Sequence, residues 1–314
     1  MKIITILSIF LILSGCRTNS PDEVLEENAA PPVSHISIAT MPSLDSLAIF
    51  VAQEKGFFDE VGLRVSIERF SAARDRDAAF QSDSSIDGLI FDALALAIYN
   101  NAGFGVKAVS NTIGLASIIG AEGIYTIEDL YGETVLLSFN TSMDYILHSA
   151  LTQAGLSATD VVQEAVPSIP TRLEMLLNGQ AGAATMPEPF STMAQEEGLN
   201  FITNTRLLDI NPFLLGFRNE VLEDRMADVE LFMLALNNAV EFLNTADREE
   251  FIDIFIDIVG YPEHTRDTLV LPTFLPFVAP ELRHIEDVFE FARSRGLLEV
   301  ELSAKDLIVD ATGN

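Results

Sequence analysis

The chain has 314 residues and carries 18 Lys and Arg against 47 Asp and Glu, which gives a formal net charge of −29. A surface this acidic repels nucleic acid and anionic lipid headgroups, so nucleic acid is excluded as a partner. Because 48% of the residues are hydrophobic, the chain is too apolar to be disordered, and we expect the acidic residues to coat a folded protein.

The N-terminus has the residue order of a bacterial lipoprotein signal. Lys2 precedes the apolar run Ile3–Leu13, which is followed by Ser14, Gly15 and the only cysteine of the chain, Cys16. The run is shorter than the about 20 residues that a membrane-spanning helix needs. We therefore expect residues 1–15 to be removed and Cys16 to carry lipid. This anchor would hold the protein on the bacterial membrane, facing the periplasm or the extracellular side.

Residues 16–34 are polar, acidic and proline-bearing, without sustained apolar periodicity. Such a segment cannot bury enough surface to fold, and it is expected to tether the lipid to the folded body. The remaining length exceeds the usual size of a single core and favours two lobes.

Strands and helices alternate in the first part of the body. Strands are expected over His35–Thr40, Leu63–Phe70, Ile86–Phe91 and Val106–Asn111. Helices are expected from Ser43 or Asp45 to Lys55, and over Ala72–Gln81 and Ala93–Asn101. Regular alternation of this kind predicts an α/β fold with a mostly parallel sheet and crossover helices.

A second run of the same kind follows. Its expected strands are Thr134–Ser138, Val161–Val166 and Ala181–Met186, and its expected helices are Ser142–Ala154, Thr171–Asn178 and Pro189–Glu197. After a strand at Phe213–Phe217, helices are expected over Val229–Asn244, Arg248–Val259 and Glu281–Arg295. The shared order of elements predicts two α/β lobes of like topology.

Three segments resemble one family of proteins. They are LAIFVAQEKGFFDEVGLRV at Leu47–Val65, with the pattern A-x-x-K-G-F-F-x-x-x-G-L-x-V, the segment Ile127–Val135, and the pair Glu188 and Pro189. Together they resemble the substrate-binding proteins of bacterial ABC transporters for sulfonates, nitrate, taurine and thiamine pyrimidine precursors.

The resemblance implies a type II periplasmic-binding-protein fold, with two α/β lobes, a ligand cleft between them and extra C-terminal helices. Lobe one would comprise residues 35–112 and 206–314, and lobe two residues 113–205. A monomer that delivers a small molecule to an ABC permease and ATPase is implied. We expect the hinge near Asn111–Leu115 and Thr203–Asn211.

Ligands of open α/β sheets lie beyond the carboxyl ends of the strands, where helix N-termini point inward. On this rule and the family resemblance, the candidate ligand-binding residues are Met41, Ser43, Asp45, Phe91, Asp92, Asn111, Ser138, Asn140, Thr141, Ser142, Tyr145, Ser168 and Glu188. Each has an ordinary alternative. Asp45 and Asp92 can be helix caps, Glu188 can fix a turn, and Tyr145 can belong to the core.

The charges near the expected cleft suggest the class of ligand. Lobe two, from Ile113 to Asn204, contains one arginine, Arg172, and no lysine, whereas Asp45, Asp92 and Glu188 lie near strand ends. Carboxylates would repel a sulfonate or nitrate and accept hydrogen bonds from N–H donors. The first expectation is therefore a nitrogen heterocycle, such as a thiamine pyrimidine precursor or a related vitamin. Anions held by helix N–H groups, and a sensory lipoprotein without transport, are the alternatives.

No pattern in the chain indicates catalysis. The four histidines, His35, His148, His264 and His284, have no metal-ligand spacing, and the cysteine is assigned to the lipid. The chain also lacks G-x-S-x-G, a phosphate-binding loop and G-x-G-x-x-G. We therefore expect a binding protein without enzymatic activity, metal or cofactor.

Overall fold

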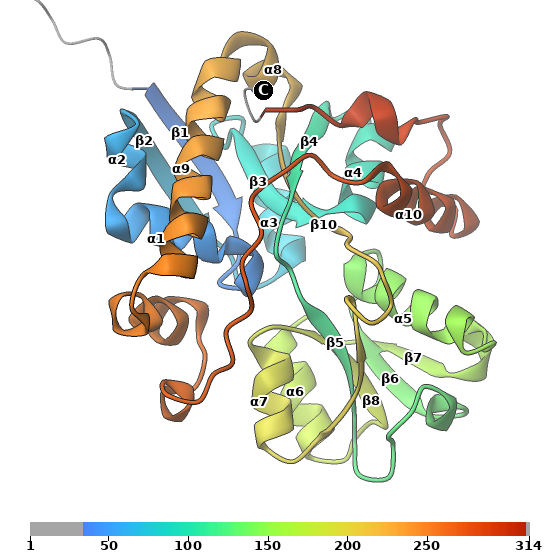
Figure 1. Cartoon of the computed structure of the whole chain (residues 1–314). Helices are drawn as coiled ribbons and strands as arrows, with labels where there is room; N and C mark the ends of the chain where they lie inside the picture. Colours follow the sequence, from blue (N-terminus) through green and yellow to red (C-terminus); the bar gives the residue numbers. More distant parts are fainter. Residues whose placement is uncertain (1–33, 312–314) are drawn as a thin grey trace, which may run out of the picture. The chain divides into compact units, whose positions relative to one another are not determined.

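The computed structural model describes residues 34–311, whose strands form two five-stranded sheets (Figure 1). The predicted signal peptide, the lipid-bearing Cys16 and the tether up to residue 33 lie outside the described residues.

The first sheet has the strand order β2-β1-β3-β10-β4. Its strands are β1 (Ser34–Thr40), β2 (Leu63–Arg69), β3 (Gly88–Asp92), β4 (Val106–Asn111) and β10 (Phe213–Arg218). β1 runs parallel to both β2 and β3, with Ser34 opposite Leu63 and Thr40 opposite Arg69. β10 runs antiparallel to β3 and to β4.

The second sheet has the strand order β7-β6-β8-β5-β9. Its strands are β5 (Ala116–Gly120), β6 (Thr134–Leu137), β7 (Val162–Ala165), β8 (Ala183–Pro187) and β9 (Asn200–Asn204). β6 is parallel to β7 and β8, whereas β5 is antiparallel to β8 and β9.

The two sheets have the same topology. In each, three parallel strands are followed by one antiparallel strand that separates them from the last strand. This confirms the predicted α/β class with two units of like topology. Each sheet is mixed: four of its five strands run in one direction, in keeping with the prediction of a mostly parallel sheet, and β10 or β5 runs against them. β5 and β10 are the first strands that the chain forms on arriving from the other sheet, so no crossover helix sets their direction.

Helices cover the faces of both sheets (Figure 1). Those of the first part are α1 (Leu47–Lys55), α2 (Phe57–Glu60), α3 (Ala73–Ser82) and α4 (Ala93–Asn101). The second sheet carries α5 (Ser142–Gln153), α6 (Ile169–Leu177) and α7 (Phe190–Glu196). After β10 come α8 (Asn219–Asp224), α9 (Met226–Thr245) and α10 (Leu282–Ser294). The short helices are η1 (Leu44–Ser46), η2 (Glu128–Leu130), η3 (Ala158–Asp160), η4 (Arg248–Glu250), η5 (Ile254–Val259), η6 (Glu263–Thr265) and η7 (Ala304–Leu307).

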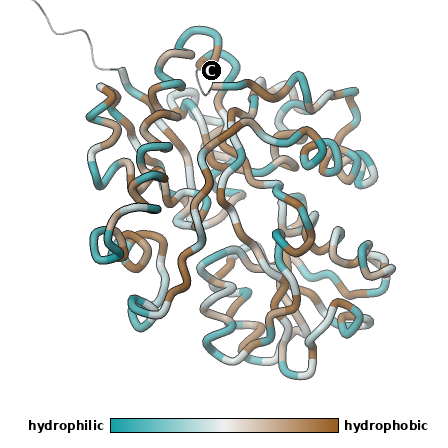
Figure 2. Tube along the Cα trace, viewed as in Figure 1, coloured by the Kyte–Doolittle hydropathy of each residue, from teal (hydrophilic) through white to brown (hydrophobic). Residues whose placement is uncertain are grey.

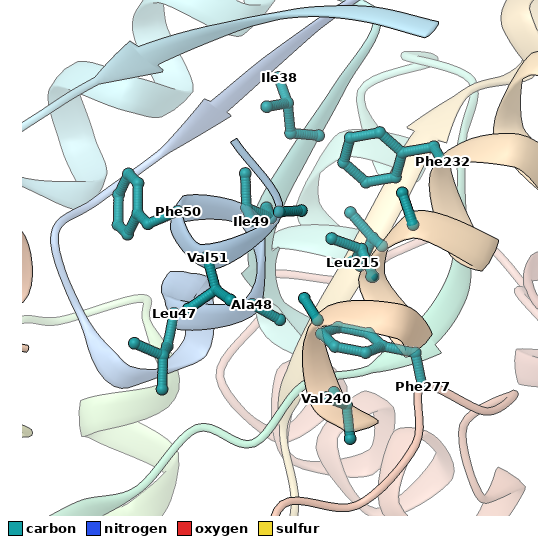
Figure 3. Close-up of a cluster of buried hydrophobic side chains, with 14 of the residues drawn as sticks. Ile38, Leu47, Ala48, Ile49, Phe50, Val51, Leu215, Phe232, Val240 and Phe277 are labelled. Atoms are coloured by element: carbon teal, nitrogen blue, oxygen red, sulfur yellow. The ribbon is translucent and has the colours of Figure 1, made fainter. Parts of the chain in front are cut away.

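The largest core lies between the first sheet and helices α1 and α9 (Figure 3). Phe232 of α9 is fully buried, stacks on Phe58 with 5.2 Å between ring centroids, and meets the edge of Phe217 at 5.7 Å. Gly56 ends α1 because its backbone is left-handed, with φ of 80°, which a residue without a side chain adopts at no steric cost. This core joins the N-terminal strands to helices that are distant in sequence.

The C-terminal region is less regular than the sequence pattern predicts. The expected helix over Arg248–Val259 is a 3-10 turn, η4, followed by a π-helical segment, η5, because the i→i+4 pattern is not kept through this stretch. Between η6 and α10 the chain is extended without regular structure, and Figure 2 shows much of this segment in the hydrophobic colour. Among residues 34–311, none of the helices combines the length and the hydropathy that membrane crossing requires.

The aromatic contacts of Phe232 predict its contribution to stability. Phe232→Ala should lower the free energy of unfolding by about 3–5 kcal/mol, because it removes the ring and leaves a cavity in the core. Leu234→Ala on the same helix is the matched control, since Leu234 is 50% exposed, and it should change stability by about 0.5 kcal/mol or less. Urea unfolding followed by circular dichroism measures both values. Equal effects of the two substitutions would contradict the assignment of Phe232 to the core.

Candidate functional site

A cavity lies between elements of the two sheets. Its volume, measured as the space that the centre of a water molecule can occupy, is about 80 Å³. We call it the inner cavity. Most of its lining residues come from the carboxyl ends of strands in both sheets and from the first turns of the helices that follow them, and Phe213 begins the antiparallel strand β10. They are Met41, Ser43, Asp45, Ala73, Arg76, Ile90, Phe91, Asp92, Ser138, Thr141, Ser142, Met143, Pro167, Ile169, Arg172, Pro187 and Phe213. This is the position at which open α/β sheets bind ligands.

Asp92, at the end of β3, joins the two halves of the inner cavity. Its Oδ1 accepts a hydrogen bond from the backbone N–H of Ala95 at 2.9 Å, and so caps α4. Its Oδ2 accepts from the backbone N–H of Ser142 at 2.9 Å, in the first turn of α5 on the second sheet. One buried carboxylate therefore satisfies N–H groups of two helices. The cap interpretation of Asp92 holds, and the same side chain also lines the cavity.

Asp45 lies on the first-sheet side of the inner cavity and is partly buried. Burial raises the pKa of its carboxyl to about 6, and the negative charge of Asp92 acts in the same direction. The positive charge of Arg76 lowers the pKa but does not outweigh burial. Ser43 precedes the same helical turn without a side-chain cap bond, and its hydroxyl donates to the carbonyl of Met41 at 3.2 Å. Asp45 is therefore a carboxyl group that changes charge close to neutral pH.

Arg172 is the most deeply buried cation of the site. Its side chain, on α6, is fully buried, and four of its N–H groups donate hydrogen bonds. Nε and one N–H of Nη2 donate to the carbonyl of Val166, at 3.1 and 2.9 Å. The other N–H of Nη2 donates to Ser138 Oγ at 2.6 Å, and one N–H of Nη1 donates to the carbonyl of Thr185. A guanidinium has five N–H groups, so one on Nη1 remains. Among residues 34–311, Arg172 has no carboxylate partner, and burial lowers its pKa to about 10.

Arg76, on α3, is the second buried guanidinium of the inner cavity. Its Nε and Nη2 both donate to Oδ1 of Asp77, at 2.8 and 2.6 Å. Its charge is therefore matched by an acidic neighbour, unlike that of Arg172. The inner cavity contains two guanidinium groups and two carboxyl groups.

The first turn of α5 forms the second-sheet wall. Thr141 caps α5, with its hydroxyl oxygen accepting from the N–H of Met143 at 3.2 Å. Asp144, in this first turn, forms an ion pair with Arg295 at 2.7 Å. Asp209, in the connection before β10, forms an ion pair with Arg283 at 2.9 Å. The N-terminus of α5 is thus held both by Asp92 and by a salt bridge to the chain after α10.

Eight of the predicted ligand-binding residues line the inner cavity together. They are Met41, Ser43, Asp45, Phe91, Asp92, Ser138, Thr141 and Ser142. The other five, Asn111, Asn140, Tyr145, Ser168 and Glu188, do not line it.

The Glu188 carboxylate accepts from the hydroxyls of Ser191 at 2.5 Å and Thr192 at 2.7 Å, and borders a separate cavity with Tyr261. Tyr145 packs against Phe291, with 5.6 Å between ring centroids.

Asn111, Asn140 and Ser168 are hydrogen-bonded within the protein. The Asn111 amide donates to the carbonyl of Phe213 at 3.2 Å, so it links the two connections between the sheets. The Asn140 backbone N–H donates to Asp144 Oδ2 at 3.3 Å, and Ser168 caps α6 by accepting from Thr171. In this structure the contacts of these side chains are those of caps, turns and packing.

Arg76 and Arg172 are not among the ligand-binding residues predicted from the sequence, yet both line the inner cavity. Both lie in the first turns of helices that follow strands β2 and β7, at the strand ends where the other candidates were sought. The same rule would have found them, since a basic residue four positions into such a helix lies at the same edge of the sheet. Their charges also change the expected acidic character of the cleft.

The pKa of Asp45 predicts a pH dependence of stability. Because the folded-state pKa of about 6 lies above the unfolded value, the folded protein binds the proton more tightly, and stability falls as pH rises from about 4 to 6. Asp45→Asn should therefore be more stable than the wild type by about 1–3 kcal/mol at pH 7.5, with the difference vanishing near pH 4. Chemical unfolding across this range measures it. Asp59→Asn, at an exposed position, is the control, and an equal gain for both variants would contradict the assignment.

Comparison with known proteins places the fold. The alkanesulfonate-binding protein SsuA from Xanthomonas axonopodis pv. citri, bound to MOPS, superposes with a TM-score of 0.75 at 17% identity, covering 90% of this chain and 100% of that chain. The nitrate-binding protein NrtA from Synechocystis PCC 6803 superposes with a TM-score of 0.72 at 14% identity, covering 88% and 85%. The desulfurization enzyme DSZB superposes with a TM-score of 0.66 at 12% identity, covering 88% and 96%.

These similarities show a periplasmic-binding-protein fold, as the sequence predicts. No curated protein sequence matches the chain significantly. Residues 43–247, well over half of the chain, match the model of the NMT1/THI5-like family, and the chain belongs to that family.

Proposed function

We propose that this protein is the extracytoplasmic solute-binding lipoprotein of an ABC importer, and that its ligand carries an anionic group. The observation that carries the proposal is the buried guanidinium of Arg172, which lines a cavity between the two sheets without a carboxylate partner among residues 34–311. Solute-binding proteins of ABC importers, with sulfonate and nitrate ligands, share the fold. In this proposal lobe one comprises residues 35–112 and 206–314, and lobe two comprises residues 113–205.

The electrostatics favour an anion over the nitrogen heterocycle first expected from the sequence. A charge buried without a partner is expensive, and a negative group on the free N–H of Arg172 would offset that cost. The hydroxyls of Ser138 and Thr141 and the first turn of α5 lie in the same wall, where helix N–H groups and the dipole favour anions. The N–H of Ser142 already donates to Asp92, so it is not available to a ligand. We therefore place the anionic group of the ligand next to Arg172.

A nitrogen heterocycle, such as a thiamine pyrimidine precursor or a related vitamin, is the second candidate ligand, and Asp45 favours it. With a pKa of about 6, this carboxyl can accept a hydrogen bond from a ring N–H when ionised and donate one when protonated. A molecule with a donor at one end and an anionic group at the other would use both Asp45 and Arg172. Binding measurements with taurine, nitrate and pyrimidines separate the two classes.

Ligand capture would proceed by closure of the two lobes. The connections at residues 112–115 and 205–212 are the two places where the chain passes between the sheets. They are hydrogen-bonded to each other, since Thr112 N–H donates to the carbonyl of Phe213 at 3.1 Å and the Asn211 amide donates to the carbonyl of Thr112 at 3.3 Å. A motion about this pair would open the inner cavity and separate Asp92 from Ser142. Closure around a ligand would present both lobes to a permease.

Binding without turnover is part of the proposal. The fold also occurs in a desulfurization enzyme, so fold alone does not distinguish binding from catalysis. The inner cavity contains Arg, Asp and Ser side chains, but its described lining includes no His or Cys that could act as base or nucleophile beside Ser138 or Ser142. Incubation with candidate ligands should return them unchanged, and turnover that scales with purified protein would contradict the proposal.

Arg172 provides the direct test of the anion site. Arg172→Met should weaken binding of methanesulfonate, the probe, by at least about tenfold, because a hydrogen bond from a charged donor contributes about 1.5–3 kcal/mol. Arg172→Lys should retain part of the affinity, since the charge remains but the planar fork is lost. Isothermal titration calorimetry measures both.

Arg64→Met, at an exposed position on β2, is the matched control and should bind like the wild type. Circular dichroism checks that each variant is folded, because Arg172 also donates to the carbonyls of Val166 and Thr185. If folded Arg172→Met binds methanesulfonate as tightly as the wild type, Arg172 has only a structural role and the anion proposal fails.

The lipid anchor is tested at Cys16. Cys16→Ser should leave the precursor unprocessed or release the protein from the membrane, because serine offers no thiol for lipid attachment. Membrane fractionation and mass spectrometry of the mature N-terminus measure the outcome. A wild-type mature protein that begins upstream of Cys16 without lipid would exclude the anchor.

A further inference from the structure

A second cavity of about 370 Å³ adjoins the inner cavity, and we call it the outer cavity. Helix α3 forms one wall, and the loop of residues 138–141 between β6 and α5 forms the other. Four residues line both cavities: Ala73, Ser138, Thr141 and Pro167. Their side chains are small, so the partition between the two spaces is thin. A ligand that enters the inner cavity therefore has room to extend beyond it.

Phe139 is the aromatic residue of the outer cavity. Its side chain is 40% exposed, and in the described part of the chain it belongs to no hydrophobic core cluster and no aromatic pair. Hydrogen bonds fix the backbone of the loop that carries it. Asn140 has a left-handed backbone with φ of 60°, its N–H donates to Asp144 Oδ2 at 3.3 Å, and Thr141 Oγ1 donates to the carbonyl of Ser138 at 2.8 Å. Phe139 thus has a defined place without a packing role.

The opposite wall carries a cation. Arg74, on α3, lines the outer cavity and makes no hydrogen bond or ion pair with any residue between 34 and 311. Its side chain is exposed, so the guanidinium is accessible to a polar group of a ligand. The amide of Gln81 lies on the same wall. The same wall includes the carboxylate of Asp77, whose Oδ1 accepts two hydrogen bonds from Arg76. The outer cavity thus presents an aromatic face opposite the donors of Arg74 and Gln81 and a carboxylate that is paired with Arg76.

We propose that the outer cavity is a second binding compartment, which takes the flat or apolar body of an organic anion whose charged group lies in the inner cavity. The inference rests on the proposed function and defines its substrate class. The ligand would be an elongated molecule with a ring or short chain, too large for the 80 Å³ of the inner cavity alone. Phe139 would contact the body of this ligand, and Arg74 and Gln81 would bond to polar atoms on it.

The test compares two probes that share a sulfonate and differ in the rest of the molecule. Methanesulfonate reaches only the inner cavity, whereas MOPS adds a propyl chain and a morpholine ring. Phe139→Ala should weaken MOPS binding by about tenfold and change methanesulfonate binding less than twofold. Ala78→Phe, which fills the outer cavity from α3, should likewise weaken MOPS alone. Calorimetry on the purified protein measures each affinity.

Phe201→Ala is the matched control, since Phe201 on β9 is 38% exposed and lines neither cavity. If methanesulfonate binds and requires Arg172, but both outer-cavity variants bind MOPS like the wild type, the second compartment is refuted and the proposed function stands. Equal weakening of both probes by Phe139→Ala would also refute it, because the loop would then act on the inner cavity. If the wild type binds neither probe, both proposals fail.

Discussion

The two hydrogen bonds accepted by Asp92 are the interaction on which the geometry of the site depends. The carboxylate ends β3, begins α4 and reaches the first turn of α5 on the other sheet. Burial raises the pKa of this group, while the N–H of Ala95 and the N–H of Ser142 favour the ionised form. An ionised group at this point holds two helix N-termini together, because each supplies donors that have no partner within its own helix.

The charges around the junction are arranged in a definite order. Arg76 is matched by Asp77, and Asp92 is matched by backbone N–H groups. In the described part of the chain, Arg172 and Asp45 of the inner cavity form no ion pair. Such buried charges destabilise a protein that binds nothing, so their retention is readily understood if a ligand completes them. The balance of charge in the cavity thus differs from that of the whole surface, which is strongly acidic.

The sequence predicted the alternation of strands and helices, and three residues that it indicates at strand ends, Asp45, Asp92 and Ser142, line the inner cavity. It did not predict β5 or β9, because ASIIG is too short and uniformly apolar, and NFITN too polar, to show the alternation of a half-buried strand. The apolar spacing of residues 254–259 does not distinguish an α-helix from a π-helix. The bond from Ser142 to Asp92 joins residues fifty positions apart, and no local pattern encodes it. Arg172 was visible as the lone arginine of its region, but only the packing shows that it is fully buried and that its hydrogen-bond partners between residues 34 and 311 are carbonyl and hydroxyl oxygens.

The interleaved strand order also constrains how the chain folds during synthesis. β10 separates β3 from β4, yet it is made only when the ribosome reaches residue 213, long after β4 ends at Asn111. The second sheet has all its strands once residue 204 has emerged. It is therefore the first unit able to close, while the earlier strands wait with unpaired edges.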